Sequence, residues 1–150
     1  MKSQIWTDAQ FEEMSWHDNH VHGLRVIETG NGEGDLVLDV DHIVEWLNCE
    51  GAGFNFRIVP VTLTFHGVMF PRISLDYAAS TVAFGPFMIH SIERRIEQRT
   101  HYVAQLWKIL ISSPRGGIEF EGRGFTQQAH GKPILSSGQC LTPEQRGHTA

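Results

Sequence analysis

The chain has 150 residues and a formal net charge of −5, with 41% hydrophobic and 19% charged residues. This length and composition fit one soluble domain that buries its own core. The acidic balance excludes an extended nucleic-acid-binding surface, because phosphate binding requires a net basic face. Cys49 and Cys140 form no CxxC pair, and no apolar run is long enough for a signal peptide or a membrane span. We therefore expect a soluble, cytoplasmic protein with no membrane partner.

The first predicted element is a short helix. Thr7-Asp8-Ala9-Gln10 has the form of a capping box, in which the threonine and glutamine side chains satisfy free backbone groups of the first turn. The pattern predicts a helix over about residues 8–14 that turns Phe11 and Met14 inward. After it, hydrophobic residues recur with a period of two, which is typical of β-strands.

A β-hairpin follows the helix. Its two strands are predicted over Val21–Glu28 and Asp35–Glu45, and the glycine-rich segment Thr29–Gly34 between them suits a hairpin loop. Even-numbered residues of the second strand are apolar, which assigns the even face to the core.

The hairpin register follows from matching the apolar faces. A pairing centred on Gly32 sets Arg25 opposite Asp39, which also pairs opposite charges. Extended by a few residues, the same register sets His22 opposite His42.

The remaining strands are predicted from alternation and turn residues. Pro60 lacks a backbone donor and marks a sheet edge or a bulge, and an exposed edge there allows homodimerisation by strand pairing. Residues 87–100 fit a helix or a half-exposed strand, and we favour a strand because its flanks are β-rich. The segments with strand character are 54–70, 73–77, 87–100, 101–111 and 118–125.

Together these elements predict a mainly β protein. About eight short strands after one N-terminal helix indicate an antiparallel β-sandwich or a partly open barrel. We expect residues 1–130 to form a single β-rich domain. Residues 131–150 are polar and rich in turn residues, and we expect a poorly ordered tail there.

The densest chemical signal is a group of histidines at the start of the hairpin. His20 and His22 share one face of a strand, and the predicted register brings His42 beside them. Three imidazoles with an open fourth position would suit zinc or another divalent transition metal, with Asp18 as a further ligand or an orienting group. The alternative is structural: these histidines would close the polar end of a hydrophobic layer through hydrogen bonds.

Paired carboxylates form a second candidate site. Asp39 and Asp41 lie two residues apart on the face opposite the core, where they could bind a cation or perform acid–base chemistry. The simpler interpretation is a charged, solvent-exposed strand face that Arg25 neutralises. We include His17 and Asp18 with this pair as candidate binding residues.

Motifs of common enzyme classes are absent from the sequence. The glycines of the Thr29–Gly34 segment lie in a hairpin rather than between a strand and a helix, so nucleotide binding has no support. There is no Gly-x-Ser-x-Gly motif, and neither cysteine lies in an activating context. We therefore assign no catalytic residue and no cofactor.

Charge is distributed unevenly along the chain. Acidic residues concentrate in the N-terminal third, and this asymmetry would either form a polar face for a protein partner or be compensated within the domain. The basic residues of the C-terminal half are Arg94, Arg95, Arg99, Lys108, Arg115 and Arg123.

Trp16-His17-Asp18, the alternating segment Leu36–Asp41 and Trp46 resemble a pattern found in small bacterial domains, some of them immunity proteins of toxin systems. The resemblance covers residues 15–75. It implies a cytoplasmic, non-enzymatic, β-rich protein that binds a partner. Our leading expectation is therefore a non-catalytic protein that binds another protein or a small ligand.

The alternative function is a metal-dependent hydrolase. In that case His20, His22 and His42 would hold the metal, and Asp18 or Asp41 would act as the base.

Overall fold

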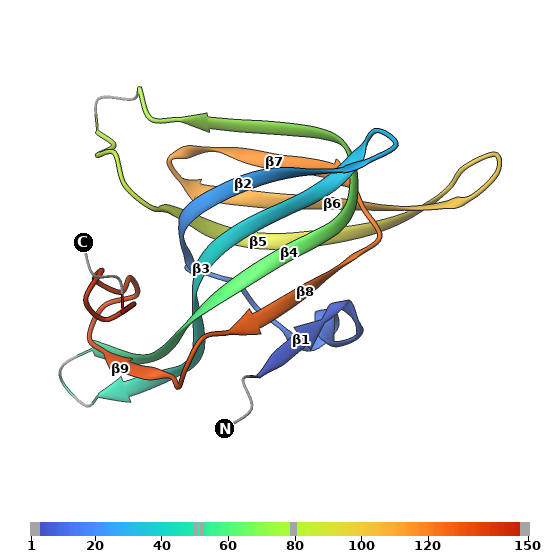
Figure 1. Cartoon of the computed structure of the whole chain (residues 1–150). Helices are drawn as coiled ribbons and strands as arrows, with labels where there is room; N and C mark the ends of the chain where they lie inside the picture. Colours follow the sequence, from blue (N-terminus) through green and yellow to red (C-terminus); the bar gives the residue numbers. More distant parts are fainter. Residues whose placement is uncertain (1–3, 50, 52, 79–80, 148–150) are drawn as a thin grey trace.

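The computed structural model of the chain describes residues 4–49, 51, 53–78 and 81–147, and 67% of it is strand (Figure 1). The predicted antiparallel, mainly β architecture is confirmed, in the form of one nine-stranded sheet. No helix in the described ranges has the length and apolar character needed to cross a bilayer. The elements are β1 (Ile5–Thr7), the 3-10 helix η1 (Asp8–Glu13), β2 (His20–Gly30), β3 (Glu33–Cys49), β4 (Gly53–Asp76), β5 (Phe87–Gln98), β6 (Val103–Ser113), β7 (Arg115–Glu121), β8 (Gly124–Ala129) and β9 (Ile134–Ser136).

The capping box at the N-terminus is confirmed. Thr7 Oγ1 accepts a hydrogen bond from the Ala9 amide at 3.3 Å, and Gln10 Oε1 accepts one from the Thr7 amide at 2.8 Å. The short helix predicted over about residues 8–14 is a 3-10 helix over Asp8–Glu13, in keeping with the use of 3-10 geometry in short pieces. Phe11 and Met14 pack against the main core as predicted.

β2 and β3 form the predicted hairpin, but its turn is tighter than expected. Only Asn31 and Gly32 lie between the strands, and both have positive φ angles, 57° and 78°. A two-residue turn of this kind follows the right-handed twist of the strands and favours Asn-Gly.

The tighter turn displaces the hairpin register by two residues. Arg25 lies opposite Val37, so the predicted pairing of Arg25 with Asp39 is wrong. The predicted pairing of His22 with His42 is also wrong, because a β-bulge leaves His22 out of the ladder. Apolar matching alone did not fix the register, since the even-numbered core face stays the same after a shift of two.

β4 is long enough to belong to two parts of the sheet, one formed with β3, β8 and β9 and the other with β7. Its N-terminal part pairs with β3 on one side and with β8 and β9 on the other, whereas its C-terminal part pairs with β7. The strand order is β1-β8-β4-β3-β2-β5-β6-β7. Because β7 also pairs with β4, the hydrogen-bonded path that leaves β4 through β3 returns to β4 (Figure 1).

An irregularity in the middle of β4 allows its two ends to pair with different strands. The sequence predicted separate strands over 54–70 and 73–77, but β4 continues through a register shift between Met69 and Arg72. Gly67 and Phe70 adopt positive φ angles of 60° and 55° on the way. Left-handed backbone is costly for a phenylalanine, so the surrounding strand pairing must hold it there.

Pro60 does not lie at a sheet edge, contrary to the expectation. It is opposite Asp41 of β3, and on its other side it falls between the residues of β4 that pair with β9 and those that pair with β8. Its carbonyl accepts the His130 amide at 2.8 Å. The missing proline donor therefore sits at a junction between partner strands, and the edge expected here for dimerisation is covered.

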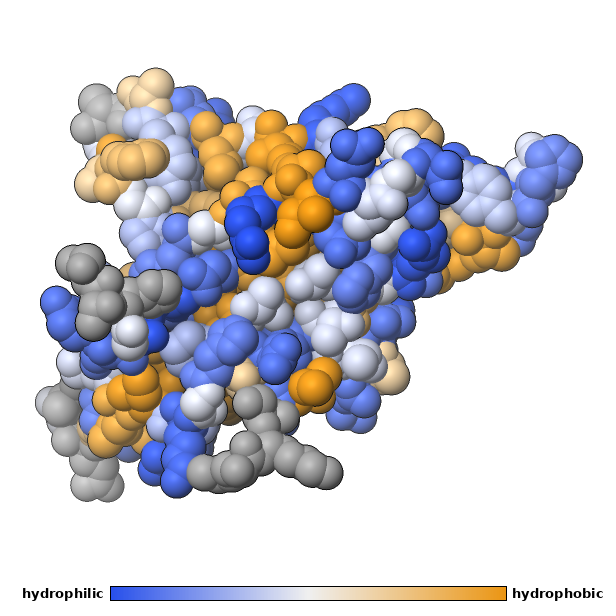
Figure 2. All heavy atoms as spheres, in the orientation of Figure 1, coloured by the Kyte–Doolittle hydropathy of each residue, from blue (hydrophilic) through white to orange (hydrophobic). Residues whose placement is uncertain are grey.

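The core lies between the two parts of the sheet. Its largest fully buried side chains include Phe65, Trp107 and Phe125. Hydrophobic side chains remain visible from outside in the region of β2 and the C-terminal arm of β4 (Figure 2). Val26 and Ile73, which lie on these strands, are 67% and 39% exposed.

The later segments confirm one prediction and correct another. Residues 87–100 contain strand β5, as we favoured. The last strand predicted over 118–125 is instead divided between β7 and β8, and β9 follows them.

The C-terminal segment, residues 131–150, was expected to be a poorly ordered tail. It contains β9, which pairs with β4, and Leu141, which is 2% exposed. Residues 148–150 lie outside the described residues.

The pairing of β4 with β7 can be tested at Gly116, which lies opposite Leu75. A Cβ atom at this position would collide with the backbone carbonyl of Ser74. We expect Gly116→Ala to lower the free energy of unfolding by about 1 to 3 kcal/mol in urea titrations. The control is Gly138→Ala, where a Cβ would meet nothing within 4 Å; a loss as large in the control would contradict the tight pairing.

Candidate functional site

The β-bulge in β2 directs His22 towards Asp41. The ladder shifts between Val21 and Gly23, which pair with Val40 and Asp39. As a result, His22 Nε2 lies 2.7 Å from Asp41 Oδ2 and donates a hydrogen bond to it. The bulge thus re-aims one side chain and shifts the register by one residue, while the strands stay paired on both sides of it.

Asp41 is fully buried, although the sequence placed it on an exposed face. Oδ2 accepts the Leu141 amide at 2.8 Å as well as His22, and Oδ1 accepts a hydrogen bond from the Arg146 guanidinium. The C-terminal segment that follows β9 supplies two of these three donors. The expectation of exposure was wrong because this segment, about a hundred residues away in sequence, covers the face.

Two contacts position the covering segment. Leu141 packs into a small second core with Ile43, Phe56 and Ile58. Thr142 and Gln145 then exchange hydrogen bonds of 2.8 and 3.2 Å in the manner of a capping box. The resulting turn directs the following residue, Arg146, back onto β3.

Arg146 bridges the two predicted aspartates. Its guanidinium donates to Asp39 Oδ1 and Asp41 Oδ1, and its side chain is 4% exposed, whereas the Asp39 side chain is 43% exposed. Arg146 therefore takes the role that the sequence gave to Arg25. A signal for it was present, since Thr142-Pro143-Glu144-Gln145 combines a capping box with proline at the first helical position.

Cys140 completes the cluster. Its Sγ lies 3.7 Å from His22 Nε2. Burial raises the pKa of the Cys140 thiol, and burial followed by the Arg146 charge lowers the pKa of His22. At neutral pH the imidazole is therefore neutral and the thiol protonated. A Cys-His-Asp triad would use both ring nitrogens of the histidine, but Asp41 and Cys140 share one, so this arrangement does not activate the thiol.

The metal ligands expected from the sequence are not brought together. Among the described residues, the group whose ligand atoms converge is His22, Asp41 and Cys140, without His20 or His42. Neighbouring residues of a strand point to opposite faces, so His42 cannot join Asp41. His20 stays near His22, and burial followed by the His22 charge lowers the pKa of His20.

His42 belongs to a buried polar network instead. Its Nδ1 lies 2.8 Å from Asn19 Nδ2, and the Asn19 Oδ1 accepts the Ile43 amide at 3.2 Å. The ring contacts Trp6 and Trp16. Burial lowers the pKa of His42 to about 4, so the ring is neutral and accepts from the amide. These contacts match the structural alternative for this histidine.

The other two candidate binding residues lie at the margin of the cluster. Asp18 accepts a hydrogen bond from Gln139 at 3.0 Å, and His17 Nε2 lies 3.6 Å from Asp18 Oδ1. The His17 ring is stacked near Trp46 with the centroids 6.5 Å apart, and both side chains are partly exposed. Asp18 thus contributes to holding the C-terminal segment, while His17 faces solvent.

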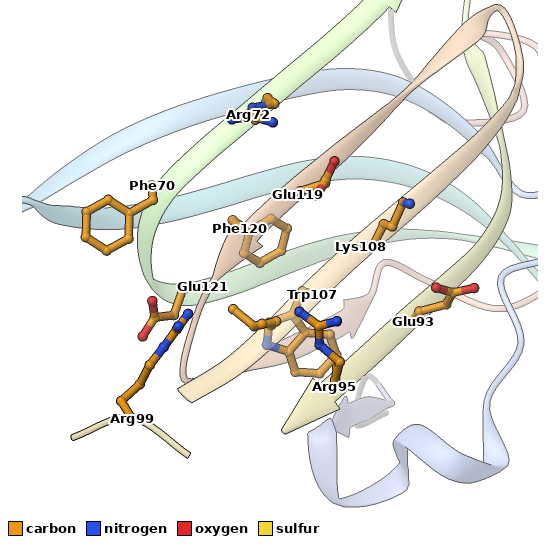
Figure 3. Close-up of a pocket in the computed structure, with 11 residues that line it drawn as sticks. Phe70, Arg72, Glu93, Arg95, Arg99, Trp107, Lys108, Glu119, Phe120 and Glu121 are labelled. Carbon is orange, nitrogen blue, oxygen red and sulfur yellow. The ribbon is translucent and has the colours of Figure 1, made fainter. Parts of the chain in front are cut away.

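A second feature is a charged groove of about 460 Å³ on the β4–β7–β6–β5 side of the molecule (Figure 3). Residues of opposite charge alternate across its strands: Lys108 lies opposite Glu93 and Glu119, and Glu119 lies opposite Arg72. Sequence patterning had placed some of these charges in the basic half of the chain but could not bring them together. The lining residues are Phe70, Arg72, Glu93, Arg95, Arg99, Leu106, Trp107, Lys108, Glu119, Phe120 and Glu121.

Comparison with known proteins identifies no relative of the chain. The chain matches no protein-family model, no curated protein and no solved structure. A function must therefore be argued from the cluster around Asp41 and from the groove.

Replacing Asp39 and Asp41 separately by asparagine tests whether the buried Asp41 contributes more to stability than the partly exposed Asp39. Asp41→Asn removes the charge from a fully buried carboxylate beside the buried Arg146, so we expect a loss of about 3 to 5 kcal/mol of unfolding free energy in urea titrations. Asp39→Asn alters a partly exposed group and should cost under about 1 kcal/mol. Equal losses would contradict the distinct environments of the two residues.

Proposed function

We propose that the protein is a non-catalytic binding protein and that Phe70 with the charged groove forms its contact surface for a partner protein. The observation that carries the proposal is Phe70, a large apolar side chain that is 77% exposed although its backbone is held at a φ angle of 55°. Exposed aromatic residues held by strained backbone are common at recognition sites, since they provide apolar contact area without much loss of conformational freedom.

The bend in β4 places Phe70 between several hollows. Phe70 and Arg72 line the charged groove, Met69 lines a neighbouring hollow of about 480 Å³, and Pro71 lines an apolar one of about 410 Å³. In Figure 3 the Phe70 ring stands at one end of the groove beside Glu121, with Arg99 pointing towards that carboxylate. A partner could therefore contact a protruding ring and concave surfaces around it at the same time.

The charges of the groove indicate the chemistry of the partner. Arg95 and Arg99 both pair with Glu97, but within the described ranges neither Arg72 nor Lys108 has a carboxylate within ion-pairing distance. The three carboxylates that line the groove likewise have no ion pair among the described residues, so the groove offers charges of both signs to a partner. We infer a partner protein that offers an apolar pocket to Phe70, acidic side chains to Arg72 and Lys108, and basic side chains to these carboxylates.

The proposal includes two further expectations from the sequence, the resemblance to small bacterial domains and the partly open barrel. The resemblance proposed for residues 15–75 is to small bacterial domains of which some are immunity proteins, and it agrees with this class of function because an immunity protein acts by binding a toxin. The return of the strand path to β4 supports a partly open barrel rather than a sandwich as the finer architecture.

The metal-dependent hydrolase has less support. Each oxygen of Asp41 already accepts at least one hydrogen bond from the protein, and the side chain is fully buried, so Asp41 is poorly placed to act as a base towards a substrate. Asp18 accepts from Gln139 and helps to hold the C-terminal segment.

Site-specific photo-cross-linking tests the proposal. A photoreactive phenylalanine analogue at position 70, introduced in the cells that produce the protein, should cross-link to one protein identifiable by mass spectrometry. With that partner purified, Phe70→Ala should weaken binding by at least about 30-fold in calorimetric titrations.

The matched control is Phe84, a phenylalanine that is 91% exposed and does not line the groove. Phe84→Ala should leave the dissociation constant within about threefold of the wild-type value. If the two variants bind equally well, or if position 84 cross-links to the same protein as position 70, the groove is not the contact surface.

A further inference from the structure

We propose that His22, Asp41 and Cys140 form a binding site for one zinc ion, which fastens the C-terminal segment to the β2–β3 hairpin. One ligand atom from each of these residues lies within 4.8 Å of the others. The three residues come from β2, β3 and the segment after β9, so an ion bound here would join parts of the chain that are far apart in sequence. The site does not involve the Phe70 groove.

The donor set fits zinc. An imidazole nitrogen, a carboxylate oxygen and a thiolate sulfur are the three kinds of protein ligand that zinc accepts, and a thiolate disfavours magnesium and calcium. The His22 side chain is 20% exposed, so an ion can reach the site from solvent and keep a water molecule as a further ligand.

The charges of the cluster also fit a divalent cation. Arg146 lies beside Asp41, but Asp39 shares and balances its charge. With Cys140 as a thiolate, two carboxylates and one thiolate face a single guanidinium, which leaves two negative charges. One Zn²⁺ ion neutralises these two charges. Without the ion the Cys140 thiol keeps its proton, because burial raises its pKa, so the metal takes the place of that proton.

The protons balance as follows. Binding of Zn²⁺ replaces the proton of the Cys140 thiol, which is released to solvent as a zinc–sulfur bond forms. His22 remains neutral, and its ring proton moves from Nε2 to Nδ1 by exchange with solvent, which frees Nε2 for the metal. Asp41 Oδ1 keeps its bond to Arg146, and this outer contact orients the carboxylate.

Cobalt substitution tests the site in the full-length protein without a histidine tag. Co²⁺ bound to a thiolate gives a sulfur-to-cobalt charge-transfer absorption that nitrogen and oxygen ligands do not give. We expect this absorption to saturate at one Co²⁺ per chain, to vanish on addition of Zn²⁺, and to be absent in Cys140→Ser. His22→Ala should weaken Co²⁺ binding by at least about tenfold.

Cys49→Ser provides the matched control, because Cys49 is the other free cysteine and lies outside the cluster. This variant should keep the absorption at full intensity. Near-ultraviolet circular dichroism should show that Cys140→Ser retains the wild-type fold. The proposal is overturned if wild-type protein gives no charge-transfer absorption, or if the absorption survives Cys140→Ser. Neither result bears on the binding of a partner at Phe70.

Discussion

The buried carboxylate of Asp41 is the constraint on which the polar half of the structure depends. A charge without solvent must be compensated by donors within the protein. In this chain the donors are His22, Leu141 and Arg146. The bulge in β2, the path of the C-terminal segment and the position of Arg146 all follow from supplying them. The strands provide the scaffold, but Asp41 determines where the last residues lie on it.

The same constraint separates the two candidate sites. The cluster around Asp41 is largely buried and its hydrogen bonds come from the chain itself, which suits structural stabilisation. The proposed zinc ion would replace the hydrogen bond from His22. The groove beside Phe70 is open, and Arg72 and Lys108 in it lack ion-pair partners among the described residues. We therefore propose that the groove recognises a partner and that the cluster holds the C-terminal segment on the sheet.

Local features could be predicted from the sequence, and long-range ones could not. The capping box at Thr7 and a hairpin turn within Thr29–Gly34 depend on neighbouring residues, and both are present, although the turn is shorter than expected. The hairpin register was wrong by two residues because apolar alternation repeats every two residues and does not distinguish such a shift. The burial of Asp41 depends on Arg146, which no periodicity connects to it. The cluster was therefore expected at His42 rather than Cys140.

The protection of the Leu141 amide against hydrogen exchange is the most direct test of the role given to Asp41. This amide lies in a segment without regular strand pairing, and its partner is the buried carboxylate Oδ2 at 2.8 Å. Exchange measured by NMR in the wild-type protein should show Leu141 protected to a degree comparable with core strand amides such as that of Leu63 in β4. Exchange at the rate of an unstructured peptide would show that Asp41 does not hold the C-terminal segment.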